Sequence, residues 1–350
     1  MIKRNCLVAG AVLALSLVAY EWAPTSATVV NAADTVLING AGATFPYPIY
    51  AKWFEEYHKN HPDIQINYQS IGSGGGIRQL LAGTVDFGAT DVPMADEQLA
   101  QAKVKILHFP TVLGAAVPTY NLPGVSQELK FTPEAIAGMY LGTIKKWNES
   151  ELMKANPGVK LPDNDIVVVH RSDGSGTTFV WTDYLSKISE EWKSKVGKAA
   201  SVSWPVGLGG KGNEGVAGLV QQTPYSIGYV ELIYAVQNKM PYGQVRNSSG
   251  AFVKASVAGV TAAAAETAKT MPDDFRVSIT NPPGKSAYPI SSFTWLLIPS
   301  TISDSAKRTA ITSVLKWMLT DGQKMTEALS YAPLPREVVK KETQAIAQIQ

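Results

Sequence analysis

The sequence has 350 residues, and its 31 lysines and arginines are almost balanced by 29 aspartates and glutamates. A chain with so little net charge lacks the broad basic surface that nucleic-acid binding requires, so we expect no nucleic-acid partner. Its single cysteine, Cys6, excludes a disulfide framework.

Residues 1–32 have the order of a secretory signal peptide. Lys3 and Arg4 precede an apolar run, and small residues follow it up to Ala32. The run is too short to span a membrane. A lipoprotein cysteine would follow the run, whereas Cys6 precedes it. We therefore expect cleavage after Ala32 and an exported, periplasmic chain that has no cysteine, no lipid anchor and no direct membrane insertion.

Beyond the leader, apolar runs typical of strands alternate with helical patterns. The expected strands are 35–42, 64–72, 85–91, 165–171, 226–236 and 293–300. The expected helices are 47–62, 75–83, 136–147, 177–192 and 306–329, the first carrying Tyr50, Trp53, Phe54 and Tyr57 at i, i+3, i+4 and i+7. This alternation predicts an α/β architecture with mostly parallel sheets, whose ligands bind on the loops that enter helices.

Two glycine-rich loops of this kind lie early in the chain. In "GAGATFPYP" (40–48), glycines allow close backbone approach, a helix start exposes free N–H groups, and Thr44 adds a hydroxyl. An ordinary strand-to-helix turn explains this loop equally well. In "SIGSGGGIRQ" (70–79), Ser73 is either the N-cap of the next helix or an anion ligand, and Arg78 is expected on the surface.

The third loop, "HRSDGSGTTF" (170–179), is the richest in hydrogen-bond donors. Arg171 suits bidentate contact with a tetrahedral oxyanion, and the hydroxyl and glycine residues after it stand at a helix start. The alternative is a surface arginine paired to Asp173. Three such loops in one chain predict a shared anion site.

Asp91 follows another expected strand, in "VDFGATDVPM" (85–94). A carboxylate next to an anion repels it unless the anion has a proton to donate. Hydrogen phosphate has such a proton at neutral pH and sulfate has none, so Asp91 would select phosphate. The alternative is that Asp91 caps the helix of "MADEQLAQ", a role for which Asp96 competes.

Other motifs do not support an enzyme. Gly207–Gly212 matches G-x-G-x-x-G, but it is not in the first strand-helix-strand unit, and an exported chain does not meet nicotinamide cofactors. The four histidines form no zinc-protease motif, and no nucleophile stands beside a base. We therefore expect binding without catalysis, with no cofactor and no metal.

Several long blocks together resemble one family. "INGAGATFPYPIYAKW", "IGSGGGIRQLLAGTVDFGATDVPM", "VHRSDGSGTTFVWTDYLSKISEEWK", "WPVGLGGKGNEGVAGLVQ" and "SIGYVE" are similar to the periplasmic phosphate-binding protein of the high-affinity phosphate ABC importer. The resemblance runs in order from Leu37 to the C-terminal "SYAPLP".

The resemblance implies a phosphate site and a role for each residue in it. The implied phosphate-binding residues are Ala43, Thr44, Phe45, Ser73, Asp91, Arg171, Ser175, Gly176 and Thr177. Asp91 would accept a proton from phosphate, and Asp173 would hold Arg171 from behind. Gly74 stands where the family often has a second serine, and this difference removes no phosphate ligand.

The resemblance also implies a fold and a function. We expect a two-lobed, type II-like periplasmic-binding-protein fold, each lobe a mixed sheet flanked by helices. Lobe I would comprise 33–117 and 286–350 and lobe II 118–285, with crossings near 117–120 and 285–288. A monomer would bind inorganic phosphate in a closed cleft and deliver it to the membrane permease of an ABC importer. The alternatives are an extracellular phosphatase of similar fold and a receptor for sulfate or molybdate.

Overall fold

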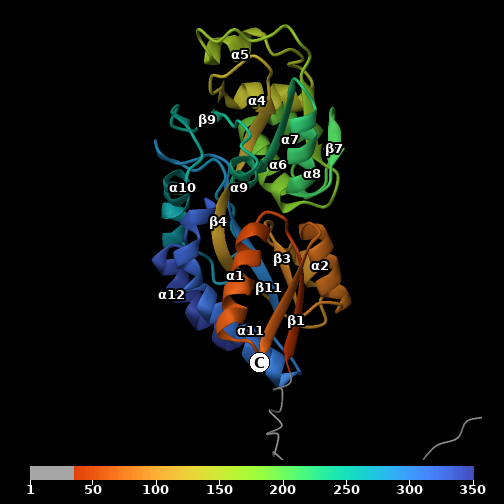
Figure 1. Cartoon of the computed structure of the whole chain (residues 1–350), viewed down its shortest axis with the longest axis vertical. Coiled ribbons are helices and arrows are strands. Elements are labelled where there is room, and N and C mark those ends of the chain that lie inside the picture. The colour runs from red at the N-terminus through yellow and green to blue at the C-terminus, as the bar shows by residue number, and fades with distance from the viewer. Residues whose placement is uncertain (1–34) are drawn as a thin grey trace, which may run out of the picture. The chain divides into compact units, whose positions relative to one another are not determined.

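A computed structural model of the chain describes residues 35–350. The expected signal peptide, its cleavage site and Cys6 lie outside these residues. Within them, strands and helices alternate as the sequence predicts (Figure 1). No helix in residues 35–350 is both long enough and apolar enough to cross a membrane.

The N-terminal group of elements forms one side of the main sheet. It comprises β1 (Val36–Gly42), α1 (Tyr47–Asn60), β2 (Ile64–Ser70), α2 (Ser73–Ala82), β3 (Phe87–Thr90) and α3 (Asp96–Leu99). β1 lies between β2 and β3 and is parallel to both. The predicted aromatic stripe of α1 is buried, because these rings pack on one another and on the sheet. Pro48 stands in the first turn of α1, where its missing N–H costs no hydrogen bond.

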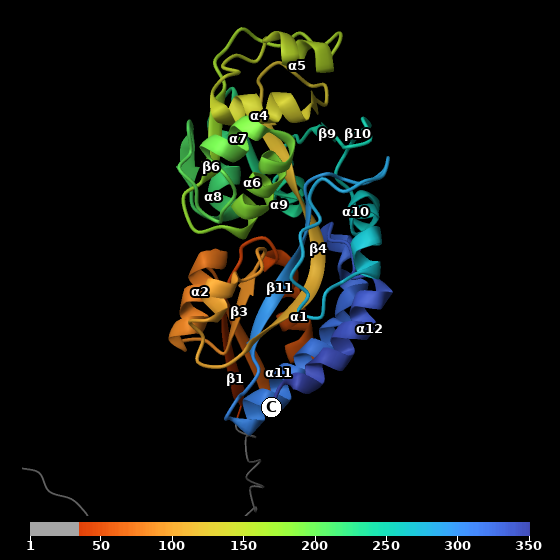
Figure 2. The same ribbon diagram turned by 180° about the vertical axis from the view of Figure 1, so that it is seen from behind.

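The longest strand, β4 (Ile106–Asn121), was not predicted from the sequence. Its first part pairs antiparallel with β11 (Ser291–Pro299), and its last residues pair antiparallel with β8 (Ser226–Glu231). Prolines 110 and 118 argue against a central strand, since proline cannot donate to the ladder. Near Pro110 the pairing with β11 shifts register, so that the irregularity accommodates the proline. Figures 1 and 2 show β4 running from the N-terminal group into the elements that follow it.

The central group follows β4. It comprises β5 (Lys130–Phe131), α4 (Pro133–Leu141), α5 (Ser150–Ala155), β6 (Val167–Arg171), α6 (Gly176–Ile188), α7 (Glu190–Lys195), β7 (Leu208–Gly210), α8 (Gly212–Gln222), β8 and α9 (Leu232–Gln237). β6 is parallel to its neighbours β7 and β8. The expected strand 226–236 ends at Glu231, because the Glu231 carboxylate accepts the N–H of Ile233 and starts α9. The expected helix 177–192 is divided at Ser189, which caps α7.

The C-terminal elements follow α9 and pack against several different parts of the chain. They comprise β9 (Gln244–Arg246), β10 (Phe252–Val253), α10 (Val257–Lys269), β11, α11 (Ser305–Met318) and α12 (Arg336–Ala345), with short 3-10 turns. The expected helix 306–329 ends at Met318 and continues as 3-10 turns. α10 contacts β4, β11 and α12, although residues 257–269 lie in the stretch predicted for lobe II. The predicted lobe boundaries stay a prediction.

Eight strands form a mixed sheet in the order β2-β1-β3-β11-β4-β8-β6-β7. The expectation of mostly parallel sheets is only partly met, because β4 and β11 run antiparallel to their neighbours. β9, β10 and β5 form a small second sheet. The carboxyl ends of β1, β2 and β3 from one group, and of β6 from the other, lead into the predicted site loops.

Candidate anion-binding site

The three predicted loops and Asp91 meet between the N-terminal and central groups. The amide of Gly74 donates to the carbonyl of Gly174 at 2.9 Å, and the amide of Gly176 donates to Ser73 Oγ at 3.1 Å. These predicted site residues are buried: Ala43, Thr44, Phe45, Ser73, Asp91, Arg171, Ser175, Gly176 and Thr177. Residues separated by 100 or more positions in the sequence are therefore brought into hydrogen-bond contact.

Glycine makes this close approach possible. A Cβ atom on Gly176 would lie 2.5 Å from both Asp91 Oδ2 and Ser73 Oγ, closer than atoms pack. Position 176 therefore requires glycine, because the loop after β6 contacts Ser73 and Asp91 there.

Arg171 is held from behind by Asp173. Its Nε donates to Asp173 Oδ1 at 2.7 Å and its Nη2 donates to Oδ2 at 2.6 Å. The Arg171 side chain is only 1% exposed, so the alternative of a surface arginine is wrong. Burial by itself raises the pKa of Asp173, but the hydrogen bonds and charge of Arg171, with the Gly212 amide, outweigh it and lower that pKa.

Two donor positions on Arg171 have no partner among residues 35–350. A guanidinium has five N–H groups. Two of them bind Asp173, and one on Nη1 donates to Thr177 Oγ1 at 3.4 Å. Among residues 35–350 nothing accepts from the other two. A buried cation with two unused donors is suited to an anion.

Asp91 contrasts with Asp173. Its Oδ1 accepts from the Thr294 hydroxyl at 2.8 Å, whereas its buried Oδ2 has no partner within the described part of the chain. Burial raises its pKa to about 7, against the Thr294 hydrogen bond, the charge of Arg171 and the Ser73 hydroxyl. α3 begins after Ala95, so Asp91 does not cap it and that alternative is wrong.

Ser73 is not a helix cap. It is the first residue of α2, after Gly72, and its side chain makes no capping hydrogen bond. Instead, Ser73 Oγ accepts from the amides of Asp91, at 3.2 Å, and Gly176. A serine oxygen has two lone pairs, so both are used and the hydroxyl can act only as a donor.

Ser175 performs the capping role that the helix start requires. Its Oγ accepts the N–H of Thr178 at 3.0 Å, at the N-cap of α6. Two residues on, the amide of Thr177 lies in the first turn, where helical N–H groups have no intrahelical acceptor.

Backbone amides add further donors. Across residues 35–350, no acceptor is found for the N–H groups of Thr44, Phe45, Ser73 and Thr177. The N–H of Ala43 differs, since it donates to the carbonyl of Ala89 at 2.9 Å. Ala43 therefore forms part of the wall and supplies no free amide.

Asn213 was missed in the sequence and lies among the predicted residues. Its Nδ2 donates to Thr44 Oγ1 at 2.7 Å and to Thr177 Oγ1 at 3.2 Å. It follows Gly207–Gly212, the stretch that we set aside as a dinucleotide motif. The only sequence signal was its place at the start of a helix after a glycine-rich strand end, like that of Ser73 and Thr177.

Glu231 is a second buried carboxyl that the sequence did not single out. It is fully buried, and burial raises its pKa well above the usual range, which favours its uncharged form. Its Oε2 accepts the N–H of Ile233 at 2.8 Å. Of the two buried carboxyls Asp91 and Glu231, Asp91 is therefore the one whose pKa lies near neutral pH.

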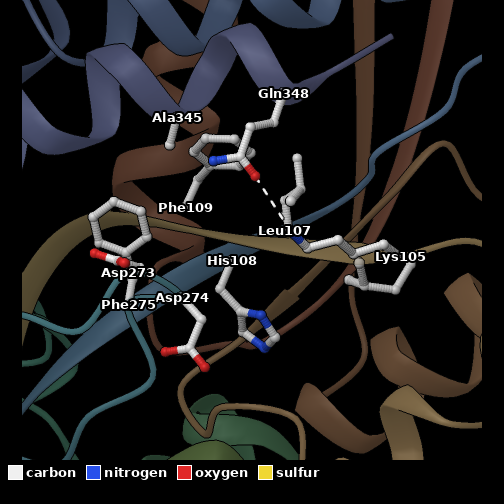
Figure 3. A pocket seen from close by; sticks show the side chains of 10 residues that line it. Lys105, Leu107, His108, Phe109, Asp273, Asp274, Phe275, Ala345 and Gln348 are labelled. Atoms are coloured by element: carbon white, nitrogen blue, oxygen red, sulfur yellow. Dashed lines mark hydrogen bonds between the residues drawn. The ribbon is translucent and has the colours of Figure 1, made fainter.

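A separate cavity lies away from these loops, beside β4. Its volume is about 170 Å³, and its lining includes Lys105, His108, Phe109, Asp274, Phe275 and Gln348 (Figure 3). Burial lowers the pKa of His108 to about 4, so its ring is neutral, and His108 Nε2 accepts the amide of Met94. Asp274 pairs with Arg276. Lys105 donates to Gln348 across this cavity, and His108 serves to fix the segment after Asp91.

The site thus presents many donors and one ionisable acceptor. Hydroxyls, backbone amides and two guanidinium N–H groups without acceptors in residues 35–350 lie on the loops that meet beside Asp91. Among the described residues, no group of three or more histidine, cysteine, aspartate or glutamate side chains could hold a metal ion. Such a donor set fits a small oxyanion that carries one proton.

The fold and this site define a periplasmic-binding-protein architecture, and a family model described as "PBP superfamily domain" matches residues 19–322. The phosphate-binding protein PstS of Xylella fastidiosa is 47% identical over 308 residues, covering 88% of this chain and 84% of the relative. PstS of Methanocaldococcus jannaschii is 39% identical, covering 88% and 85%. This chain therefore belongs to the PstS family of phosphate-binding proteins.

Solved structures agree on the fold. A high-affinity periplasmic phosphate-binding protein bound with phosphate has a TM-score of 0.69 at 20% identity, covering 89% of this chain and 93% of that one. A putative phosphate ABC transporter substrate-binding protein from Clostridium perfringens, with bound phosphate, has a TM-score of 0.62 at 18% identity, covering 85% and 100%. The predicted fold class, an α/β periplasmic-binding-protein fold with mixed sheets, is confirmed.

Proposed function

We propose that this chain binds one inorganic phosphate ion between its N-terminal and central groups and delivers it to an ABC importer. The observation that carries the proposal is Asp91 Oδ2, a buried acceptor without a partner in residues 35–350, which lies beside Gly176 and Ser73 where the predicted loops meet. Its family relatives are named phosphate-binding proteins.

The proposed ligand contacts follow from the unused hydrogen-bond groups. Three kinds of group donate to the phosphate oxygens. They are the amides of Thr44, Phe45, Ser73 and Thr177, the hydroxyls of Thr44, Ser73, Ser175 and Thr177, and two N–H groups of Arg171. Gly176 allows Ser73 and Asp91 to approach, Ala43 forms part of the wall, and Asp173 orients Arg171.

Asp91 makes the site selective for a protonated anion. In its ionised form, Oδ2 accepts the P–OH proton of hydrogen phosphate. Fully ionised sulfate offers no proton, so the two oxygens would face each other as unpaired acceptors, which costs several kcal/mol between charged groups. Phosphate is therefore preferred over sulfate and molybdate.

We propose that the two lobes close around the ion by moving about the two crossings that join them. Lobe I comprises 33–117 and 286–350 and lobe II comprises 118–285, with crossings near 117–120 and 285–288. The hydrogen bonds from Gly176 to Ser73 and from Gly74 to Gly174 would hold the closed state. Opening would break these bonds and release the ion.

Transport requires a membrane partner and an exported receptor. We place the protein in the periplasm as a monomer after signal-peptide removal, and its partner is the permease of the importer. One solved structure with the same fold is named a periplasmic phosphate-binding protein, which agrees with this location. The chain is a binding protein and not a phosphatase, as membership in the PstS family indicates.

Calorimetric titration tests the proposal. Protein refolded to remove bound anion is titrated with phosphate and, separately, with sulfate. We expect one site with micromolar or tighter phosphate affinity, about −8 kcal/mol or more, and at least about 100-fold weaker sulfate binding. Absence of phosphate binding, or equal affinity for both anions, would contradict the proposal. Hydrolysis of a phosphomonoester by the same sample would support the phosphatase instead.

A further inference from the structure

Asn213 connects the two walls of the site. It lies in the first turn of α8, in the central group, and it is fully buried. Its backbone amide and its side chain both reach Thr44, which follows β1 in the N-terminal group, at 3.2 and 2.7 Å. Its side chain also reaches Thr177 at the start of α6.

The orientation of the Asn213 amide is fixed by a third contact. The side-chain oxygen accepts the backbone N–H of Glu231 at 2.9 Å. A backbone N–H is only a donor, so the atom facing it must be Oδ1 and not Nδ2. Nδ2 therefore points both of its protons at the two threonine hydroxyls.

The hydroxyl oxygens then have no acceptor capacity left. Thr44 Oγ1 accepts from the backbone amide and from Nδ2 of Asn213. Thr177 Oγ1 accepts from Nδ2 of Asn213 and from Nη1 of Arg171, both of which are only donors. A hydroxyl has two lone pairs and one proton, so each threonine must direct its proton elsewhere. Neither hydroxyl donates to any group in residues 35–350.

We infer that Asn213 is a positioning residue that forces the hydroxyls of Thr44 and Thr177 to donate to the bound anion, while tying the two walls of the closed site together. The inference rests on the proposed phosphate function and assigns a cause to the donor character of the site. Asn213 acts through the two threonines and needs no contact with the anion.

Two substitutions separate this role from simple packing. Asn213→Asp keeps the shape and the contact with the Glu231 amide, but it places an acceptor opposite both hydroxyls. The threonine protons then turn toward residue 213 and away from phosphate. Asn213→Ala leaves the hydroxyls free to rotate. We expect about tenfold weaker phosphate binding for Asn213→Ala, and at least another tenfold loss for Asn213→Asp. A packing role gives the opposite order, because aspartate preserves the volume.

A charge-neutral cycle separates hydroxyl orientation from the added charge of aspartate. In Thr44→Val one of the two hydroxyls is missing, so Asn213→Ala should cost at least threefold less affinity there than in the parent. The matched control is Asn156→Ala. Asn156 is a buried asparagine with bonds to Lys130 and Leu152. This control should lower the melting temperature and leave phosphate affinity unchanged.

The outcomes are distinct. Parent protein that binds phosphate, with the expected order and non-additive cycle, supports the inference. Two results overturn the inference alone, provided that the parent binds phosphate. In the first, Asn213→Asp loses as much phosphate affinity as Asn213→Ala, or less. In the second, the affinity losses of Asn213→Ala and Thr44→Val simply multiply in the double variant. A parent that binds no phosphate overturns the proposed function and the inference together. If Asn213→Asp does not fold, the Asn213→Ala and Thr44→Val cycle decides.

Discussion

Two strand-end loops on opposite sides of the site each place an aspartate near the same guanidinium, with opposite results. In the loop after β6, both oxygens of Asp173 accept hydrogen bonds from Arg171, and Oδ1 also accepts the Gly212 amide. In the loop after β3, Asp91 Oδ1 accepts a hydrogen bond from the Thr294 hydroxyl, and Oδ2 has no partner in the described part of the chain. The residue type is the same, and the hydrogen-bond partners decide the role.

The pKa directions follow the same division. Arg171 and the Gly212 amide overcome burial and lower the pKa of Asp173, so it stays ionised and compensates the arginine. At Asp91 burial dominates and raises the pKa to about 7. A carboxyl that titrates near neutral pH, with one free oxygen, is suited to exchange a proton with hydrogen phosphate.

Removal of the shared guanidinium should have the largest effect. Arg171→Ala deletes two donors to the anion and leaves Asp173 half-buried without its partner. We expect phosphate and sulfate binding both to weaken by at least about 100-fold, measured by calorimetry. Arg78→Ala, on the exposed face of α2, is the control and should bind like the parent. Phosphate affinity within threefold of the parent would show that Arg171 is outside the site.

The loop after β6 should affect affinity without affecting selectivity. Asp173→Asn keeps an oxygen for Arg171 Nε but turns a donor toward Nη2, so the guanidinium loses its orientation. Phosphate and sulfate should weaken together, by about tenfold, with their ratio unchanged. The control is Asp163→Asn, which breaks only an exposed pair with Lys146 and should change neither affinity. A changed ratio in Asp173→Asn would contradict the division between the loops.

Sulfate binding should depend on pH through Asp91. With a pKa of about 7, Asp91 is protonated below that pH and can donate to sulfate. Above it, the protonated fraction and hence sulfate affinity fall tenfold per pH unit. Phosphate affinity should stay nearly flat, because phosphate brings its own proton. Titrations across this range check the slope, and a sulfate profile as flat as that of phosphate would be evidence against a titrating Asp91.

The smallest change concerns the Thr294 hydroxyl. It donates to Asp91 Oδ1 and so favours the ionised form. Thr294→Val should raise the pKa of Asp91 and move the midpoint of the sulfate profile to higher pH, with little change in phosphate affinity. A midpoint that stays in place or moves to lower pH would show that Thr294 does not tune Asp91.

Part of the fold and much of the candidate site could be predicted from the sequence. Parallel strands end at one edge of a sheet, so "GAGATF" and "GSGGG" could be expected near one another. The third loop, "RSDGSGTT", follows β6, which runs antiparallel to β1 and meets these loops from the central group. β4 could not, because Pro110 and Pro118 interrupt the pattern of a strand that pairs with distant β8 and β11.

Details that depend on long-range pairing were also beyond the sequence. Ser73 looked like a helix cap, but its acceptors are used by the amides of Asp91 and Gly176. Asn213 lies 169 positions from Thr44, and only folding shows that it orients this threonine. Local patterns predict which loops face a ligand, whereas hydrogen-bond direction within the site is set by tertiary contacts.

The most direct test compares phosphate and sulfate binding by the parent and by Asp91→Asn above pH 7. An asparagine at position 91 can offer its amide N–H where the carboxylate could only accept. The account predicts that the parent prefers phosphate by at least about 100-fold. In Asp91→Asn sulfate affinity should rise and phosphate affinity should fall, so that the preference is nearly lost. If Asp91→Asn keeps the preference of the parent, Asp91 is not the selective acceptor and the account is wrong.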